Sequence, residues 1–84
     1  MGYALYLYPS WEKSYKKLDV ISKERAHEAL LKIVENPYIG KPLSANLKGI
    51  WSFRFGTFRI LYQINESEKE IFINALGLRK NVYD

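Results

Sequence analysis

Two arginines flank a tight turn in the segment Arg54–Arg59, which reads RFGTFR. A two-residue loop that begins with glycine is typical of a type II′ hairpin turn, because glycine accepts a positive φ at little cost. That turn places Arg54 opposite Arg59 on one face of a strand pair, where like charges repel each other. Guanidinium groups bind phosphate oxygens well, so a bound phosphate would relieve the repulsion. The alternative is that both arginines are solvated or stack on neighbouring aromatic rings.

The remaining basic residues of interest lie in two stretches that contain no acidic residue, 36–65 and 71–83. Together with the arginines of the turn, the cations of these stretches are Lys41, Lys48, Arg79 and Lys80. A basic field confined to one part of a fold suggests a polyanionic partner, most often nucleic acid. A formal net charge of +4 is also ordinary for a soluble domain, so charge alone does not decide between these interpretations.

The residue types limit the chemistry. The chain contains no cysteine, and His27 is its only histidine, which we interpret as a solvated helical residue. We therefore expect no metal site, no Ser-His-Asp or Cys-His set and no cofactor. Cations suffice for the attack of an RNA 2′-hydroxyl on its own 3′ phosphate, because the nucleophile is intramolecular and the protein mainly orients it and stabilises the phosphorane. A lysine near arginines has a lowered pKa and suits a general base; Lys48 is the nearest candidate.

Tyr83 near the end of the sequence offers an aromatic ring close to Arg79 and Lys80. Such a ring stacks on a nucleobase when it is exposed. The alternative is that Tyr83 only pins the last residues to the sheet.

Hydrophobic periodicity predicts the elements that must position these side chains. We expect a strand over Tyr3–Tyr8, then a short helix capped by Ser10, and a longer helix that is capped by Ser22 and stopped by Asn36-Pro37. The apolar stripe of the longer helix comprises Ala26, Ala29, Leu30, Ile33 and Val34. The short helix carries Trp11, Tyr15 and Leu18.

A loop over residues 37–49 precedes three further strands, Ile50–Phe55, Phe58–Ile64 and Ile71–Leu76, with a polar turn at 65–70. This order predicts one α+β domain over residues 1–84, in which two N-terminal helices pack on one face of a small antiparallel-rich sheet (β-α-α-β-β-β). The face that meets the helices is expected to carry Trp51, Phe53, Phe55, Phe58, Ile60, Tyr62 and Ile64. Arg54 and Arg59 are then exposed on the open face.

The first residues, MGYALYLYPS, lack the basic region of a signal peptide and are too short for a membrane span. The absence of cysteine fits a reducing compartment. We expect a cytoplasmic protein that does not contact a membrane.

Three segments after YPSWEKSYKKL carry a resemblance to a known family: LKG (47–49), FRFGTFRILYQI (53–64) and INALGLRKNVY (73–83). The chain resembles the RelE toxins of the RelE/ParE group over practically its whole length. The resemblance implies a toxin that cleaves messenger RNA in the ribosomal A site and leaves a 2′,3′-cyclic phosphate. It also implies three partners, which are the ribosome, the mRNA and a cognate antitoxin.

The resemblance assigns roles to individual residues. Arg59 matches the arginine that stabilises the reacting phosphate. Arg79 matches the arginine implicated in charge stabilisation and leaving-group assistance. Tyr83 matches the tyrosine that stacks on the target nucleotide. Arg54 matches the second of two basic positions before the turn, whereas Ser52 occupies the first and departs from the pattern. The general base therefore stays unassigned.

Three lysines complete the candidate site. We expect Lys41, Lys48 and Lys80 to contact RNA. Lys48 and Lys80 are the candidates for the base, and the alternative is an activity weaker than that of the family. Two other functions stay open. ParE-type relatives share the fold but poison DNA gyrase, and a domain of the same fold could bind RNA or the ribosome without cleaving it.

Overall fold

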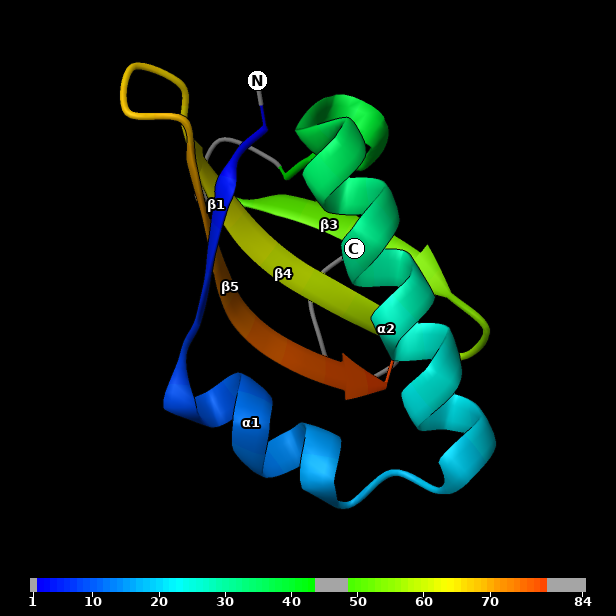
Figure 1. Cartoon of the computed structure of the whole chain (residues 1–84). Coiled ribbons are helices and arrows are strands. Elements are labelled where there is room, and N and C mark those ends of the chain that lie inside the picture. Colours follow the sequence, from blue (N-terminus) through cyan, green and yellow to red (C-terminus); the bar gives the residue numbers. More distant parts are fainter. Residues whose placement is uncertain (1, 44–48, 79–84) are drawn as a thin grey trace.

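The computed structural model describes residues 2–43 and 49–78. Along the chain, its elements are β1 (Ala4–Leu7), α1 (Pro9–Lys16), α2 (Val20–Glu35), the 3₁₀ helix η1 (Pro37–Ile39), β2 (Lys41–Pro42), β3 (Trp51–Phe55), β4 (Phe58–Asn65) and β5 (Glu70–Leu78). The strands form one sheet in the order β1-β5-β4-β3-β2, in which β1 runs parallel to β5 and the other neighbours are antiparallel. The predicted α+β class is confirmed (Figure 1).

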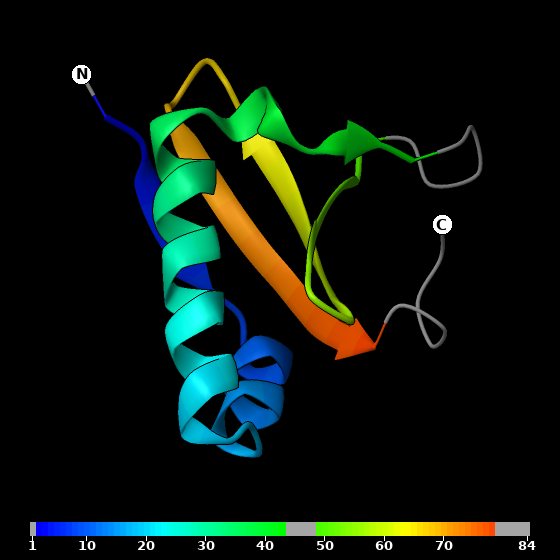
Figure 2. The ribbon, with the colours of Figure 1, turned by 90° about the vertical axis from the view of Figure 1, so that its right-hand side faces the viewer.

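The helices lie on one side of the sheet. Figure 1 shows α2 crossing β3 and β4 while α1 lies beside the end of β5. In Figure 2, which is turned by 90°, α2 runs along one side of the sheet, and no helix of the described residues covers the other side. We call this second side the open face.

The prediction of a loop over residues 37–49 was wrong in part, because this segment contains η1 and the edge strand β2. Two residues are too few to show the alternation that identifies a strand, and Pro42 cannot donate a backbone hydrogen bond. β2 instead forms by pairing, with Lys41 opposite Ser52 and Pro42 opposite Trp51.

Both predicted helix caps were wrong. Helix α1 starts with Pro9 in its first turn, where the ring suits the helical φ, and no side chain caps it. Ser10 instead donates a hydrogen bond to the carbonyl of Asn74. Helix α2 is capped by Asp19, which accepts a 2.8 Å bond from the backbone N–H of Ser22. That bond also lowers the pKa of the Asp19 carboxyl.

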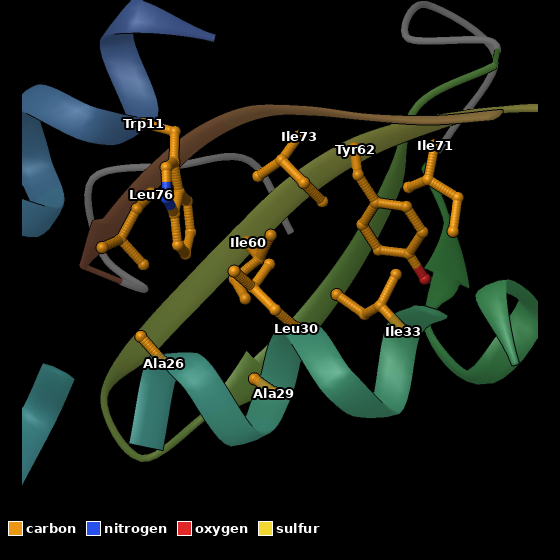
Figure 3. Close-up of a cluster of buried hydrophobic side chains, with 10 residues drawn as sticks. All are labelled: Trp11, Ala26, Ala29, Leu30, Ile33, Ile60, Tyr62, Ile71, Ile73 and Leu76. Carbon is orange, nitrogen blue, oxygen red and sulfur yellow. The ribbon is translucent and has the colours of Figure 1, made fainter. Parts of the chain in front are cut away.

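The core lies between the sheet and the two helices, as Figure 3 shows. Its buried members are Trp11, Ala26, Ala29, Leu30, Ile33, Ile60, Tyr62, Ile71, Ile73 and Leu76. The predicted stripe of α2 is therefore confirmed, with Val34 only half-buried. The other apolar side chains predicted on this sheet face pack at its margin, half-buried against the cluster.

Tyr62 couples the core to the start of β2. Its hydroxyl donates a 2.7 Å bond to the carbonyl of Pro37 and accepts a 3.2 Å bond from the N–H of Gly40. A Cβ at Gly40 would lie 2.5 Å from this hydroxyl and 2.6 Å from the Ser52 carbonyl, so only glycine fits here. Burial raises the pKa of Tyr62 to about 12. The phenol is thus a fixed neutral link between η1 and the sheet.

No helix among residues 2–43 and 49–78 has the length and apolarity needed to cross a membrane.

Candidate anion-binding site on the open face

The β3–β4 hairpin has the turn that the sequence predicts. Gly56 has a φ of 57°, and Thr57 is not among the residues with positive φ, which is the combination of a type II′ turn. Arg54 pairs directly with Arg59 across the two strands. Phe55 pairs with Phe58, and their rings stack with centroids 5.5 Å apart. Alternation then places the phenylalanines on the helix side and both arginines on the open face.

Arg59 is not exposed, contrary to our prediction. Only 5% of the residue is accessible, and it donates a 2.9 Å hydrogen bond from Nη1 to the Oγ of Ser52. Ser52 is equally buried at 5% and lies on the same face, two residues before Arg54. Arg59 therefore leans diagonally toward Ser52 and not toward the arginine directly opposite. Gly77, its neighbour on β5, has no side chain to occupy this part of the face.

Ser52 is the site residue whose role the sequence did not reveal. The family resemblance marks this position only as a missing basic residue. In the structure its hydroxyl is a buried acceptor for a guanidinium, and it adds no second positive charge beside Arg59. The available signal was a small polar residue on the strand face that the hairpin register shares with Arg54 and Arg59, but the register does not show toward which neighbour the long side chain of Arg59 turns.

Arg54 and Lys41 form the accessible part of the basic group. Both side chains are exposed, and Lys41 lies opposite Ser52 on β2. No salt bridge inside the described ranges engages either of them. We call Arg54, Arg59 and Ser52 the Arg54–Arg59 site, with Lys41 at its edge. The site places one exposed and one buried arginine on adjacent strands. Such an arrangement suits an anion with several oxygens.

Four predicted residues, Lys48, Arg79, Lys80 and Tyr83, lie outside the described residues. His27 is exposed on α2, so its interpretation as a solvated histidine is confirmed. In the described part of the chain, no three His, Cys, Asp or Glu side chains come together as metal ligands would.

The open face also carries aromatic rings away from the basic group. Tyr6 and Tyr8 contact Phe72 of β5.

Comparison with known proteins agrees with this fold. A family model described as the ParE-like toxin of type II bacterial toxin–antitoxin systems matches residues 5–84. The chain is also similar to Toxin RelG of Mycobacterium tuberculosis, with 38% identity over 45 residues, which are 54% of this chain and 52% of that protein. The match thus spans about half the length of this curated relative.

Solved structures show the same architecture. The RelBE2 toxin–antitoxin complex from Mycobacterium tuberculosis superimposes with a TM-score of 0.86 at 26% identity, covering 94% of this chain and 100% of that one. The archaeal RelE–RelB complex from Pyrococcus horikoshii OT3 gives 0.78 at 21% identity, covering 98% and 100%. The isolated E. coli RelE toxin gives 0.77 at 20% identity, covering 90% and 83%. The last two identities establish likeness of fold alone.

The resemblance to the RelE/ParE group is confirmed by these comparisons. Because the family model matches almost the entire chain, the protein belongs to the ParE-like toxin family of type II bacterial toxin–antitoxin systems.

Proposed function

We propose that this protein is the toxin of a toxin–antitoxin pair and acts as a ribosome-dependent, metal-independent endoribonuclease. Its substrate is mRNA in the ribosomal A site, and the upstream product ends in a 2′,3′-cyclic phosphate while the downstream product begins with a 5′-hydroxyl. The observation that supports this most is the pairing of Arg54 with Arg59 across the hairpin, which places two arginines on the face that no described helix covers. Family membership and the similarity to Toxin RelG support the same proposal.

The proposed step needs little covalent chemistry from the protein. The 2′-hydroxyl oxygen attacks the adjacent phosphorus, the bond from phosphorus to the 5′ oxygen breaks, and a proton passes from the former to the latter. Negative charge accumulates on the phosphorane oxygens, where fixed cations stabilise it most. Arg54, being exposed, receives the phosphate, and Arg59 strengthens the field from a partly desolvated position.

Burial of Arg59 has a consequence for this step. At 5% exposure its guanidinium offers almost no surface to a phosphate, so close contact requires the surrounding side chains to rearrange when RNA binds. The free protein should therefore be a poor ribonuclease, because the substrate geometry and the final arrangement of the site are set on the ribosome. Arginine is too basic to accept the proton itself. Lys48 and Lys80 stay the proposed bases, and Arg79 and Tyr83 keep the roles that the resemblance implies.

The proposed partner in the resting state is a cognate antitoxin. Two of the similar structures are complexes of a RelE-type toxin with its antitoxin. We propose a largely disordered, acidic-leaning protein that folds around this domain and masks its basic group. Its association rate should fall as salt rises, while apolar anchors hold the complex. Titration with the product of the adjacent gene tests this, and no complex at micromolar concentration in any salt would contradict it.

Cleavage of mRNA on translating ribosomes tests the catalytic proposal. Arg59→Ala should reduce the rate constant by about 100-fold or more, because loss of one transition-state cation costs about 3 kcal/mol. Arg25→Ala is the matched control, since Arg25 is an exposed arginine on α2 and not on the open face. Full cleavage by folded Arg59→Ala protein, or equal loss in both variants, would refute the assignment.

Poisoning of DNA gyrase is the second candidate, favoured by the match to a family named for ParE-like toxins. A supercoiling assay with purified gyrase separates the two. Inhibition of supercoiling without any mRNA cleavage would replace the ribonuclease proposal.

A further inference from the structure

Three aromatic side chains gather on the open face, toward the end of the sheet opposite the β3–β4 turn. Tyr6 of β1 stacks on Phe72 of β5, with ring centroids 5.3 Å apart and planes inclined by 19°. Tyr8 meets the same Phe72 ring edge-on, with centroids 6.3 Å apart at 61°. Tyr6 is 45% exposed and Tyr8 41% exposed. Much of the area of both tyrosines is therefore open to a partner with a π face.

Beside these rings, the surface has a hollow of about 490 Å³. Tyr8 and Phe72 form its aromatic wall, and Gln63 and Asn65 contribute carboxamides. The Oδ1 of Asn65 accepts a 3.0 Å bond from the Ser67 hydroxyl, which leaves the amide nitrogen as the donor for a ligand. An aromatic wall combined with hydrogen-bonding amides is how proteins recognise an unpaired nucleobase.

The two ends of the open face differ in charge. The basic group lies at the turn, whereas Glu66 lines the hollow and Glu70 accepts a 3.4 Å bond from the Tyr6 hydroxyl. Hydrogen bonds from Lys69, Tyr38 and Tyr3 hold the pKa of Glu66 at about 2, so this carboxylate is ionised at neutral pH. The Glu66 carboxylate forms an ion pair with Lys69, and no other described residue that lines the hollow is charged. Phosphate is therefore attracted to the turn and not to the hollow, whereas an uncharged base can bind there.

Strand geometry gives the separation of the two ends. Arg59, Leu61 and Gln63 follow one another on the open face of β4. Four residues of strand span about 13 Å at about 3.3 Å per residue. That distance equals about four nucleotides of a strand stacked at about 3.4 Å each, and fewer in an extended chain.

We propose that the hollow beside Tyr8 and Phe72 binds a nucleobase of single-stranded RNA, from a nucleotide that flanks the phosphate held at the Arg54–Arg59 site. The inference rests on the proposed function and adds to it a second contact with the RNA. An acidic segment of an antitoxin fits this place less well, because no cation of the described residues lines the hollow and the Glu70 carboxylate lies beside Tyr6. Apolar protein segments, in turn, leave the carboxamides of Gln63 and Asn65 without hydrogen-bond partners.

The experiment uses the full chain and a single-stranded RNA hexamer with 2′-O-methyl groups, which block the attacking hydroxyl so that binding is measured without cleavage. One abasic nucleotide is moved along the hexamer, and affinity is followed by fluorescence anisotropy. We expect one abasic position to weaken binding by about 5- to 150-fold, the usual contribution of one stacked base. Tyr8→Ala should weaken binding of the intact hexamer by a similar factor and remove the sensitivity to that abasic position.

Two variants keep the interpretation specific. Tyr8→Phe preserves the ring and should bind as the wild type does. Ile39→Ala changes a side chain of similar exposure, 42%, on η1 and should also leave affinity unchanged. Gln63→Ala tests the hollow independently of the aromatic rings. It should lower the affinity for the hexamer by about 5-fold, the contribution of one hydrogen bond.

Nucleobase binding in the hollow is refuted if folded Tyr8→Ala protein binds the hexamer with unchanged affinity. It is also refuted if the abasic series changes the affinity of Tyr8→Ala as it changes that of the wild type. It is also refuted if Tyr8→Ala weakens antitoxin binding and leaves RNA binding intact, because the surface then serves the protein partner. Failure of the proposed function looks different: ribosomes with wild-type protein would show no cleavage, while the dependence on Tyr8 and on the abasic position would persist.

Discussion

Replacing Ser52 with alanine tests the most specific contact of the Arg54–Arg59 site. The change removes one hydroxyl and introduces no new bulk, so the strand can keep its path. Its direct effect is the loss of the 2.9 Å hydrogen bond that the Oγ of Ser52 accepts from Nη1 of Arg59. Both residues are 5% exposed, so bulk water does not readily replace the lost acceptor.

The expected cost follows from this burial. A hydrogen bond that involves a charged group contributes about 1.5–3 kcal/mol, and more is lost when the charge stays buried. For a domain of 84 residues, each kcal/mol changes the melting temperature by about 4–8 °C. Ser52→Ala should therefore lower the melting temperature by about 6–24 °C. Cleavage should fall as well, because Arg59 loses a hydrogen bond that helps to orient its guanidinium plane.

Thermal unfolding followed by circular dichroism measures the stability change. Ser67→Ala is the matched control, since the Ser67 hydroxyl also makes a 3.0 Å hydrogen bond but is exposed, and its loss should cost less than about 0.5 kcal/mol. In an Arg59→Ala background, Ser52→Ala should have almost no effect, which gives a coupling energy of about 1.5–3 kcal/mol. Equal melting temperatures for Ser52→Ala and Ser67→Ala, or no coupling to Arg59, would refute the reasoning.

Three further outcomes are expected. Arg59→Ala should destabilise the fold by about 1–3 kcal/mol in denaturant unfolding, because burial of its stem and its bond to Ser52 outweigh the relief of repulsion; a gain in stability would contradict this. Glu66 has a folded-state pKa of about 2, below its ordinary 4.5, so its stabilising effect is complete above pH 4.5 and is lost as pH falls through 2. Melting temperatures between pH 5 and 2 should therefore fall more steeply in the wild type than in Glu66→Gln; parallel curves would disprove this. Tyr62→Phe should cost about 1–3 kcal/mol by calorimetry, because the carbonyl of Pro37 loses its 2.7 Å donor; a neutral result would show that the link is not structural.

The sequence alone determined the hairpin and the class of fold. Glycine at position 56 specifies the turn, the turn specifies the register, and the register places Arg54 opposite Arg59. All three are local consequences of backbone sterics and of the two-residue period of a strand. The apolar stripe of α2 was equally readable, because its spacing depends only on the helical period.

Element ends were less readable from the sequence. Helix α1 starts at a proline without a side-chain cap, and α2 takes Asp19 as its cap although Ser22 is also a good capping residue. Strand β2 exists only through its pairing with β3. Each outcome depends on competition between neighbouring groups or on a partner far along the chain. The periodicity of one segment gives no information about either.

Tertiary structure decided the environment of the functional side chains. Alternation placed Arg59 on the open face but could not show that it is buried, or that the hydroxyl at Ser52 holds it. It also could not show that Tyr8 of β1 meets Phe72 beside a hollow, since that contact depends on the parallel pairing of the first and last strands. Burial and cross-strand contacts depend on which elements pack together, and only the folded chain brings these distant residues into contact.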